Sequence, residues 1–346
     1  MSRLLVTPYS FPIIYLVVSA VLIALELIYF KIAQKYGIVD KPSELNPHKK
    51  TTIRGGGVIF WFAGLFYFLL HITTINIWFF VGFTMLALVS FLDDVIDLPA
   101  KSRLVFQFFA LIFTFIASDF FYIYPWWIII IAFFVFQGVI NVYNFMDGIN
   151  GITSFYSISV LLSFQYVNLF VHQFVHPDFI WFPLIACFIL LFFNFRKQAK
   201  CFLGDVGSVS IGFWIVTLLI ILIVDTNNII WFGFLMVYGV DGVMTLLHRL
   251  YLGEDVTTRH RTNLFHILSD KRVYCQKNVS LGYFFVQTIV SALIIWLYPI
   301  IGWWIFAATL FALLVVFNIW RIKLMKRYEM RIYRWQEPTN GIDVTM

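Results

Sequence analysis

The stretch FPIIYLVVSAVLIALELIYF, residues 11–30, decides the fold class, because Glu26 is its only charged residue. An α-helix needs about 20 apolar residues to cross a bilayer. The stretch is too long for a signal-peptide core, and no small-residue cleavage site follows it, so we expect a retained helix. The whole chain of 346 residues is 61% hydrophobic and 12% charged, whereas soluble domains carry about 25% charged residues. We predict an all-α polytopic integral membrane protein.

Apolar runs predict about 11 transmembrane helices with short connections. The length leaves no room for a sizeable soluble domain, so we expect one membrane-embedded domain over 1–346 that ends in a basic tail, 321–346. The predicted helices are 11–32, 56–72, 76–92, 104–119, 124–141, 151–171, 179–194, 207–224, 228–247, 281–298 and 300–320.

The positive charges test this count. When the eleven helices are threaded alternately with the N-terminus outside, 23 of the 24 Lys and Arg residues fall on one side, and only Arg3 falls on the other. The positive-inside rule makes the loaded side cytoplasmic. The N-terminus is then outside and the C-terminus cytoplasmic. The net charge of +6 comes from basic residues in short loops, so we attribute it to membrane orientation and to the binding of anionic ligands. We expect no nucleic-acid partner.

A basic stretch from His48 to Arg54 precedes three glycines, Gly55 to Gly57. Cationic side chains and bare backbone N–H groups can together bind a phosphate. The alternative is a positive-inside anchor followed by a flexible turn.

Two adjacent acids, Asp93 and Asp94, end an apolar run. Carboxylates are costly near lipid, and at such a position they can hold Mg²⁺ on a phosphate or act as a base. The alternative is a helix-end cluster paired with Lys101 and Arg103.

Asn141, Asn144 and Asp147 recur every three residues at the end of another apolar run, and Asn150 follows in an Asp-Gly-Ile-Asn-Gly break. This spacing lines one side of a helix with oxygen ligands for a hard cation, and amides also recognise a nucleobase edge. The alternative is hydrogen bonding between helices.

Asp205 stands between two glycines, Gly204 and Gly207, at the start of a helix. It combines a metal ligand with the free N–H groups of a helix N-terminus, which attract phosphate. The alternative is a helix-capping Asp.

The longest predicted cytoplasmic loop carries Arg259, His260 and Arg261, with His266 beyond them. Two guanidiniums can bind a pyrophosphate bidentately. The alternative is a solvated basic loop. All five clusters fall on the cytoplasmic side, and together they suit phosphoryl transfer between a nucleotide and a lipid, where catalysis is mostly positioning and charge neutralisation.

The ordered set of motifs resembles the polyprenyl-phosphate N-acetylhexosamine-1-phosphate transferase superfamily, which is glycosyltransferase family 4-like. Each motif is short, but five in order between residues 48 and 266 are specific. The matching stretches are His48…Arg54-Gly-Gly-Gly, Asp93-Asp94 with Leu98-Pro-Ala-Lys101, Asn141-x-x-Asn144-x-x-Asp147-Gly, Gly204-Asp205-x-Gly-Ser and His260-Arg261.

The resemblance implies that UDP-N-acetylhexosamine and undecaprenyl phosphate react to undecaprenyl-diphospho-N-acetylhexosamine and UMP. It implies Mg²⁺, with Mn²⁺ as the other candidate ion, in a bacterial cytoplasmic (inner) membrane with the site at the cytoplasmic face. It leaves room for a homodimer. The helix count and orientation resemble the branch that starts O-antigen and related glycans.

The resemblance also assigns roles by position. The metal ligands are Asn144 and Asp205. The catalytic acids are Asp93, Asp94 and Asp147, of which the adjacent pair activates the lipid phosphate or supports the metal. The substrate-binding residues are His48, Arg54, Lys101, Asn141, Asn150, Arg259, His260, Arg261 and His266, among which Arg259 to Arg261 hold the donor's pyrophosphate and sugar and Asn150 meets the uridine.

This sequence departs from the family pattern at Asn263, where a second histidine often follows His-Arg-x. The departure weakens any role for a histidine acid or base. Features that bind a pentapeptide are not evident, which makes the phospho-N-acetylmuramoyl-pentapeptide transferase branch of peptidoglycan synthesis the less favoured alternative.

Two other classes of protein remain as alternatives. A membrane prenyltransferase also uses Asp-rich motifs, but it would need a second one and would leave Arg259 to Arg261 unexplained. A transporter would place polar residues near the bilayer midplane or on both faces.

Overall fold

The computed structural model describes residues 11–40, 51–73, 76–96, 98–196, 198–255, 261–330 and 332–333. In these ranges the chain is almost entirely helical, with one short two-stranded hairpin. The α-helices are α1 (Phe11–Tyr36), α2 (Val58–Leu70), α3 (Ile77–Ile96), α4 (Ala100–Ala117), α5 (Phe120–Ile123), α6 (Trp126–Met146), α7 (Ile152–Tyr166), α8 (Asp178–Asn194), α9 (Gly204–Thr226), α10 (Met236–Leu252), α11 (Leu264–Asp270), α12 (Gln276–Ile301) and α13 (Trp304–Arg327). A π-helix, η1 (Val167–Val171), extends α7, and a 3₁₀-helix, η2 (Ile229–Leu235), leads into α10.

The predicted class, a multi-pass helical membrane protein, is confirmed. Within the described residues, eight helices are long and apolar enough to cross a membrane. Each of the eleven predicted apolar runs coincides with a helix. Three of these helices, α2, α4 and α8, are not among the eight, and α2 and α8 have only 13 and 17 residues.

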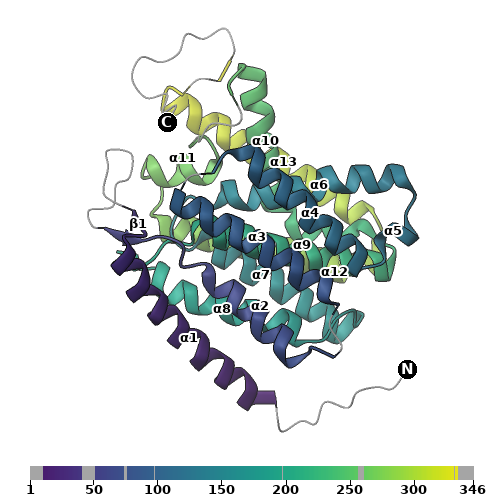
Figure 1. Ribbon diagram of the computed structural model, residues 1–346. Coiled ribbons are helices and arrows are strands. Elements are labelled where there is room, and N and C mark those ends of the chain that lie inside the picture. Colours follow the sequence, from purple (N-terminus) through teal and green to yellow (C-terminus); the bar gives the residue numbers. More distant parts are fainter. Residues whose placement is uncertain are drawn as a thin grey trace.

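Helix α9 is the centre of the bundle (Figure 1). It is apolar on all sides, as expected of a helix surrounded by protein, and 94% of an 18-residue stretch of it is buried. Helices α2, α3, α6 and α7 pack around it. By contrast, α12 and α13 are only 22% buried, and they expose large apolar side chains such as Trp296, Ile300 and Phe311. These surfaces suit contact with lipid.

The β-hairpin lies at the same end of the bundle as α11, and α5 lies toward the other end (Figure 1). Strand β1 (Val39–Asp40) pairs antiparallel with β2 (Thr52–Ile53). Ile53 of β2 also forms a parallel β-bridge with Cys201, which lies just before α9 begins. The hairpin therefore attaches the glycine stretch to the N-terminus of the central helix.

The three glycines after β2 pack directly against that N-terminus. A Cβ atom on Gly57 would come within 2.0 Å of the Gly207 Cα, so only glycine allows this approach. Gly56 N–H donates to the Phe202 carbonyl at 2.9 Å, and Gly57 N–H donates to the Leu203 carbonyl at 2.8 Å. The expectation that these N–H groups face a phosphate is wrong for Gly56 and Gly57, because backbone carbonyls already accept both.

Candidate active site

Asp94, near the end of α3, caps the N-terminus of α9. Its Oδ1 accepts the backbone N–H of Asp205 at 2.9 Å, and its Oδ2 accepts that of Val206 at 3.0 Å. Arg54 donates from Nε to the same Oδ1 at 2.9 Å. The anion at this helix N-terminus is thus the protein's own carboxylate. The sequence-based expectation that these two N–H groups are free for phosphate is wrong.

The backbone at Gly204 makes this cap possible. Its φ is +73°, and a Cβ atom there would lie 2.5 Å from Asp94 Oδ2. A side chain would be strained by the backbone conformation and would also collide with the capping carboxylate. The Gly-Asp motif therefore requires its glycine for the contact with α3.

Arg103 of α4 forms ion pairs with two further acids, Asp93 and Asp205. Its Nη1 lies 2.9 Å from Asp93 Oδ2 and 3.0 Å from Asp205 Oδ2. Asp93 also accepts the Leu98 backbone N–H through Oδ1 at 2.6 Å. The pairing of the acids with Arg103, the alternative considered from the sequence, thus occurs. Lys101 is exposed and forms no ion pair with a described residue.

Asp147 follows the last turn of α6 and accepts the Thr153 hydroxyl at 2.8 Å. Burial raises the pKa of its carboxyl to about 7, because it disfavours the charged form, and the charge of Asp94 raises it further. The hydrogen bond from Thr153 acts in the opposite direction. A carboxyl that titrates near neutral pH can accept or release a proton at working pH.

His266, in the short helix α11, packs against the turn that follows Asp147. A Cβ atom on Gly148 would lie 2.5 Å from the imidazole Nε2. The other ring nitrogen, Nδ1, is 3.7 Å from Asp270 Oδ2. His266 is buried, so the predicted loop histidine belongs to the interior of this end of the bundle.

The three amides of the third motif have different surroundings. Asn141 exchanges hydrogen bonds with Gln107 of α4, at 3.0 and 3.4 Å, so here the interhelical alternative occurs. Asn144 is half-buried one turn later. The Asn150 carbonyl accepts the Ser280 hydroxyl at 3.0 Å, which ties the loop to α12.

Arg261 forms a bidentate pair with Asp270, at 2.8 and 3.0 Å. A ligand phosphate would have to compete with that carboxylate for the guanidinium. The other predicted members of this group, Arg259 and His260, lie outside the described residues, as does His48.

Sequence reasoning missed Asn194, at the end of α8. Its Oδ1 accepts the Gly151 N–H at 2.6 Å, and its Nδ2 donates to the Cys201 carbonyl at 2.9 Å. One side chain thereby joins the loop after Asp147 to the loop before Asp205. Only the fold brings these loops together, so the sequence offered no signal for it.

Asp241, inside α10, was also missed. It accepts the Tyr283 hydroxyl at 2.5 Å and the Leu264 N–H, the start of α11, at 3.1 Å. Asn263 Nδ2 lies 3.4 Å from the same carboxylate, so the residue that departs from the family pattern has a place in the interior. The sequence did hold a signal for Asp241, because an acid within an apolar run such as 228–247 is costly in a membrane and is therefore a candidate functional residue.

Comparisons with known proteins agree with this geometry. Residues 76–223 match the family described as Glycosyl transferase family 4. A probable undecaprenyl-phosphate N-acetylglucosaminyl 1-phosphate transferase of Bacillus subtilis is 26% identical over 202 residues, 53% of this chain and 55% of the relative. An undecaprenyl-phosphate α-N-acetylglucosaminyl 1-phosphate transferase of Escherichia coli O157:H7 is 26% identical over 219 residues, 55% of this chain and 56% of the relative.

These matches support the resemblance to the polyprenyl-phosphate N-acetylhexosamine-1-phosphate transferase superfamily that the motifs indicated. The family match contains Asn144 and the four acids Asp93, Asp94, Asp147 and Asp205.

The branch within the superfamily is less defined. A phospho-N-acetylmuramoyl-pentapeptide-transferase of Petrotoga mobilis is 28% identical over 200 residues, 49% of this chain and 60% of the relative. Its identity is close to that of the other two relatives, so these matches do not separate the branches. The chain spans between 55% and 60% of the length of these curated relatives.

Proposed function

We propose that this protein transfers N-acetylhexosamine 1-phosphate from a UDP-sugar to undecaprenyl phosphate. An oxygen of the lipid phosphate forms a bond to the phosphorus attached to the sugar, and the bond from that phosphorus to the oxygen of the departing UMP breaks. The observation that carries the proposal is the gathering of Asp93, Asp94, Asp147 and Asp205 at one end of the bundle, beside an apolar groove.

The four carboxylates fit a divalent cation. Within the described residues, only the guanidiniums of Arg54 and Arg103 form ion pairs with them. When all four acids are ionised, two negative charges therefore remain without a partner. Oxygen ligands are those that Mg²⁺ prefers. We assign Asp205 and Asn144 to hold the ion, which when bound supplies neutralisation of phosphate charge.

The protein's own groups have complementary roles in this proposal. Arg103 keeps Asp93 and Asp205 side by side, and Asp94 fixes the start of α9 that carries Asp205. Asp147 can take the proton of a lipid phosphate monoanion, because its pKa is about 7. His266 packs against Gly148 in the turn after this acid, and we assign it to the donor site.

The groove accounts for the lipid. It lies between α6, α10 and α13, has a volume of about 580 Å³, and is lined almost entirely by apolar side chains, including Phe134, Val243 and Phe306. Asn141 is one of its few polar residues, and it stands on α6 one turn before Asn144. A polyprenyl chain lying in the groove would therefore have its phosphate end close to the acids.

Two glycines line the groove, and replacing them with larger residues tests whether the lipid binds there. Gly138 and Gly239 line the groove, and no other atom lies within 4 Å of a Cβ placed on either. We expect Gly138→Leu and Gly239→Leu to raise the KM for polyprenyl phosphate about tenfold, or about 1.4 kcal/mol, with the KM for the nucleotide sugar unchanged. Leu has a better helix propensity than Gly, so folding should not suffer.

Gly282 of α12 is the matched control, since a Cβ there also meets nothing within 4 Å but the residue does not line the groove. Gly282→Leu should leave both KM values unchanged. Equal KM values for the lipid in all three variants would remove the groove from the substrate path.

We also propose that all eleven predicted helices cross the membrane, with the N-terminus outside and the active site at the cytoplasmic face. Helix α2 begins at the acid end, where Gly57 packs on Gly207, and α3 ends there with Asp93. The two helices therefore run in opposite directions, as the threading requires. The acid end also carries Arg54 and Arg103, two of the basic residues that the positive-inside rule assigns to the cytoplasm.

The decisive experiment is a donor panel. Purified protein is incubated with undecaprenyl phosphate, Mg²⁺ and one UDP-sugar at a time, and UMP is measured. We expect release that needs the lipid phosphate and stops in excess chelator. No UMP from any donor would refute the proposed reaction, and full activity in chelator would refute the metal.

The panel also tests the second candidate, transfer of phospho-N-acetylmuramoyl-pentapeptide. The Petrotoga mobilis relative favours that candidate, because it matches at 28% identity. UMP release with UDP-N-acetylmuramoyl-pentapeptide alone would assign the protein to that branch, whereas release with UDP-N-acetylhexosamines alone would exclude it.

A further inference from the structure

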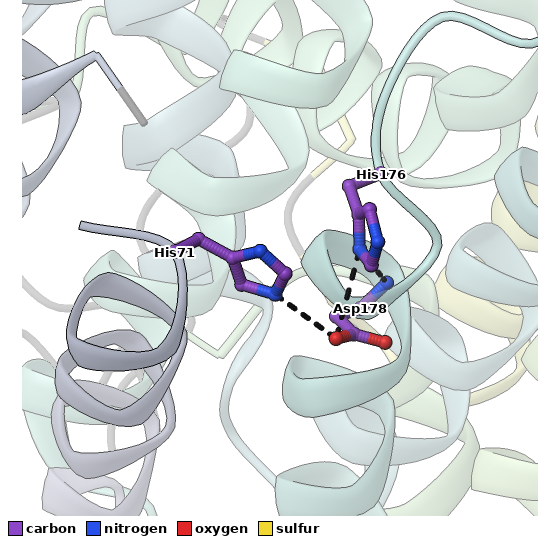
Figure 2. A group of neighbouring side chains, drawn as sticks. All are labelled: His71, His176 and Asp178. Atoms are coloured by element: carbon purple, nitrogen blue, oxygen red, sulfur yellow. Dashed lines mark hydrogen bonds and ion pairs between the residues drawn. The ribbon is translucent and has the colours of Figure 1, made fainter. Parts of the chain in front are cut away.

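His71, His176 and Asp178 point toward one another at a second place in the molecule (Figure 2). His71 Nε2 is 3.0 Å from Asp178 Oδ2, and His176 Nδ1 is 3.6 Å from the same oxygen. One ligand atom of each residue lies within 4.8 Å of the other two. The arrangement offers two imidazole nitrogens and one carboxylate oxygen to a single point.

The cluster is remote from the acids of the candidate active site. His71 follows the C-terminal end of α2, whereas the N-terminal end of α2 packs on Gly207. Asp178 begins α8, whereas Asn194 at the other end of α8 joins the active-site loops. At 1.5 Å per residue, 13 and 17 residues span roughly 20 and 25 Å. The cluster therefore lies at the opposite end of the bundle.

The distances suit a small transition-metal ion. Zn²⁺ binds His and Asp at about 2.0–2.2 Å with tetrahedral geometry, which places two ligand atoms roughly 3.3–3.5 Å apart. The observed 3.0 and 3.6 Å to Asp178 bracket that value. The two imidazole nitrogens lie within 4.8 Å of one another, so they would have to approach by up to about 1.3 Å to complete the geometry. The side chains of His71, His176 and Asp178 are 17%, 38% and 11% exposed, which leaves an approach for an ion and a position for water.

Two further contacts arrange the ligand atoms. The Asp178 backbone N–H donates to His176 Nδ1 at 3.3 Å, so this nitrogen is unprotonated, and its lone pair would leave this long hydrogen bond to bind the ion. The Tyr15 hydroxyl of α1 donates to Asp178 Oδ1 at 2.6 Å. That bond orients the carboxylate and leaves Oδ2 toward the two histidines, as partners behind a metal ligand commonly do.

We propose that His71, His176 and Asp178 form a binding site for a divalent transition-metal ion, with Zn²⁺ as the first choice and water as the fourth ligand. Two imidazoles with one carboxylate select such an ion over Mg²⁺, which prefers oxygen ligands alone. Bound there, the ion links the ends of α2 and α8, and through Tyr15 it also holds α1. The site is structural and does not depend on the proposed transferase reaction.

The test measures metal on the full-length protein in detergent, with any affinity tag removed. The protein is stripped with chelator and dialysed against Zn²⁺ in a large excess of Mg²⁺, which occupies the oxygen-ligand sites. We expect one Zn²⁺ more in the parent than in His71→Gln or His176→Gln, and a rise in the unfolding temperature on Zn²⁺ addition in the parent alone. Co²⁺ in place of Zn²⁺ should give the visible absorption of a four-coordinate ion.

The matched control is His172→Gln. His172 pairs with Asp225, but the described residues supply no third ligand at that pair, so this variant should bind Zn²⁺ as the parent does. Tyr15→Phe should weaken binding about 10–100-fold, the usual effect of removing a partner behind a ligand, although Tyr15 does not touch the ion.

A cluster held only by hydrogen bonds would give other results. Equal Zn²⁺ content in the parent and both histidine variants, or a parent that takes up no Zn²⁺ and shows no Co²⁺ absorption, would overturn the proposal. The Co²⁺ absorption spectrum is measured on the parent protein alone. The proposal can therefore still be tested if either histidine variant fails to fold.

Discussion

Asp205→Asn is expected to lower UMP release by at least a hundredfold and to leave the unfolding temperature nearly unchanged. Losing one preorganised group that stabilises transition-state charge costs about 10²–10³ in kcat. The Asp205 carboxylate is placed for that role, since it lies beside Asp93 and pairs with Arg103. Among the described residues, the backbone N–H groups of Asp205 and Val206 at the start of α9 are capped by Asp94.

The measurement compares turnover and thermal unfolding in Asp205→Asn and Asp225→Asn. Asp225 stands near the other end of the same helix and is exposed, so its variant should keep both properties. Turnover near that of the parent in Asp205→Asn would exclude Asp205 from catalysis. A large loss of stability would instead mean that the carboxylate holds the fold.

The sequence could predict the helices because each depends on its own apolar run. The stretch 11–30 lies within α1, and the run 207–224 lies within α9. A span needs only length and apolar composition, and both are local. The sequence also predicted that Asp93, Asp94 and Asp205 belong to one site, and the structure does bring them together. Their roles stay predictions.

The sequence could not predict the partners of those groups. Whether the N–H groups at the start of α9 meet a phosphate or a carboxylate depends on Asp94, which is 111 positions from Asp205. The use of Gly56 and Gly57 by backbone carbonyls depends equally on packing. Asp205 was weighed as a cap of its own helix, but the cap comes from α3. These contacts form only when distant segments pack, and no local pattern records them.

Asp94→Ala is expected to reduce stability as well as activity, which separates it from its neighbour Asp93. The Asp94 side chain is fully buried, and its removal takes away the carboxylate to which Arg54 and the N–H groups of Asp205 and Val206 donate. Breaking a buried ion pair by removing one partner costs about 3–5 kcal/mol. We expect a clearly lower unfolding temperature in detergent and a turnover below detection, since Asp205 would also lose its position.

Asp93→Ala is the matched control, because it removes an adjacent carboxylate with different partners. Arg103 would keep Asp205 as an acceptor, and the Leu98 N–H is on a partly exposed loop where water can replace the carboxylate. Its unfolding temperature should fall by much less than that of Asp94→Ala. In the double variant Arg54→Ala/Asp94→Ala the loss should be smaller than the sum of the two single losses, since each single variant already loses the ion pair that the two residues share. Equal losses in Asp93→Ala and Asp94→Ala, with additive effects in the double variant, would show that the cap from α3 does not hold the start of α9.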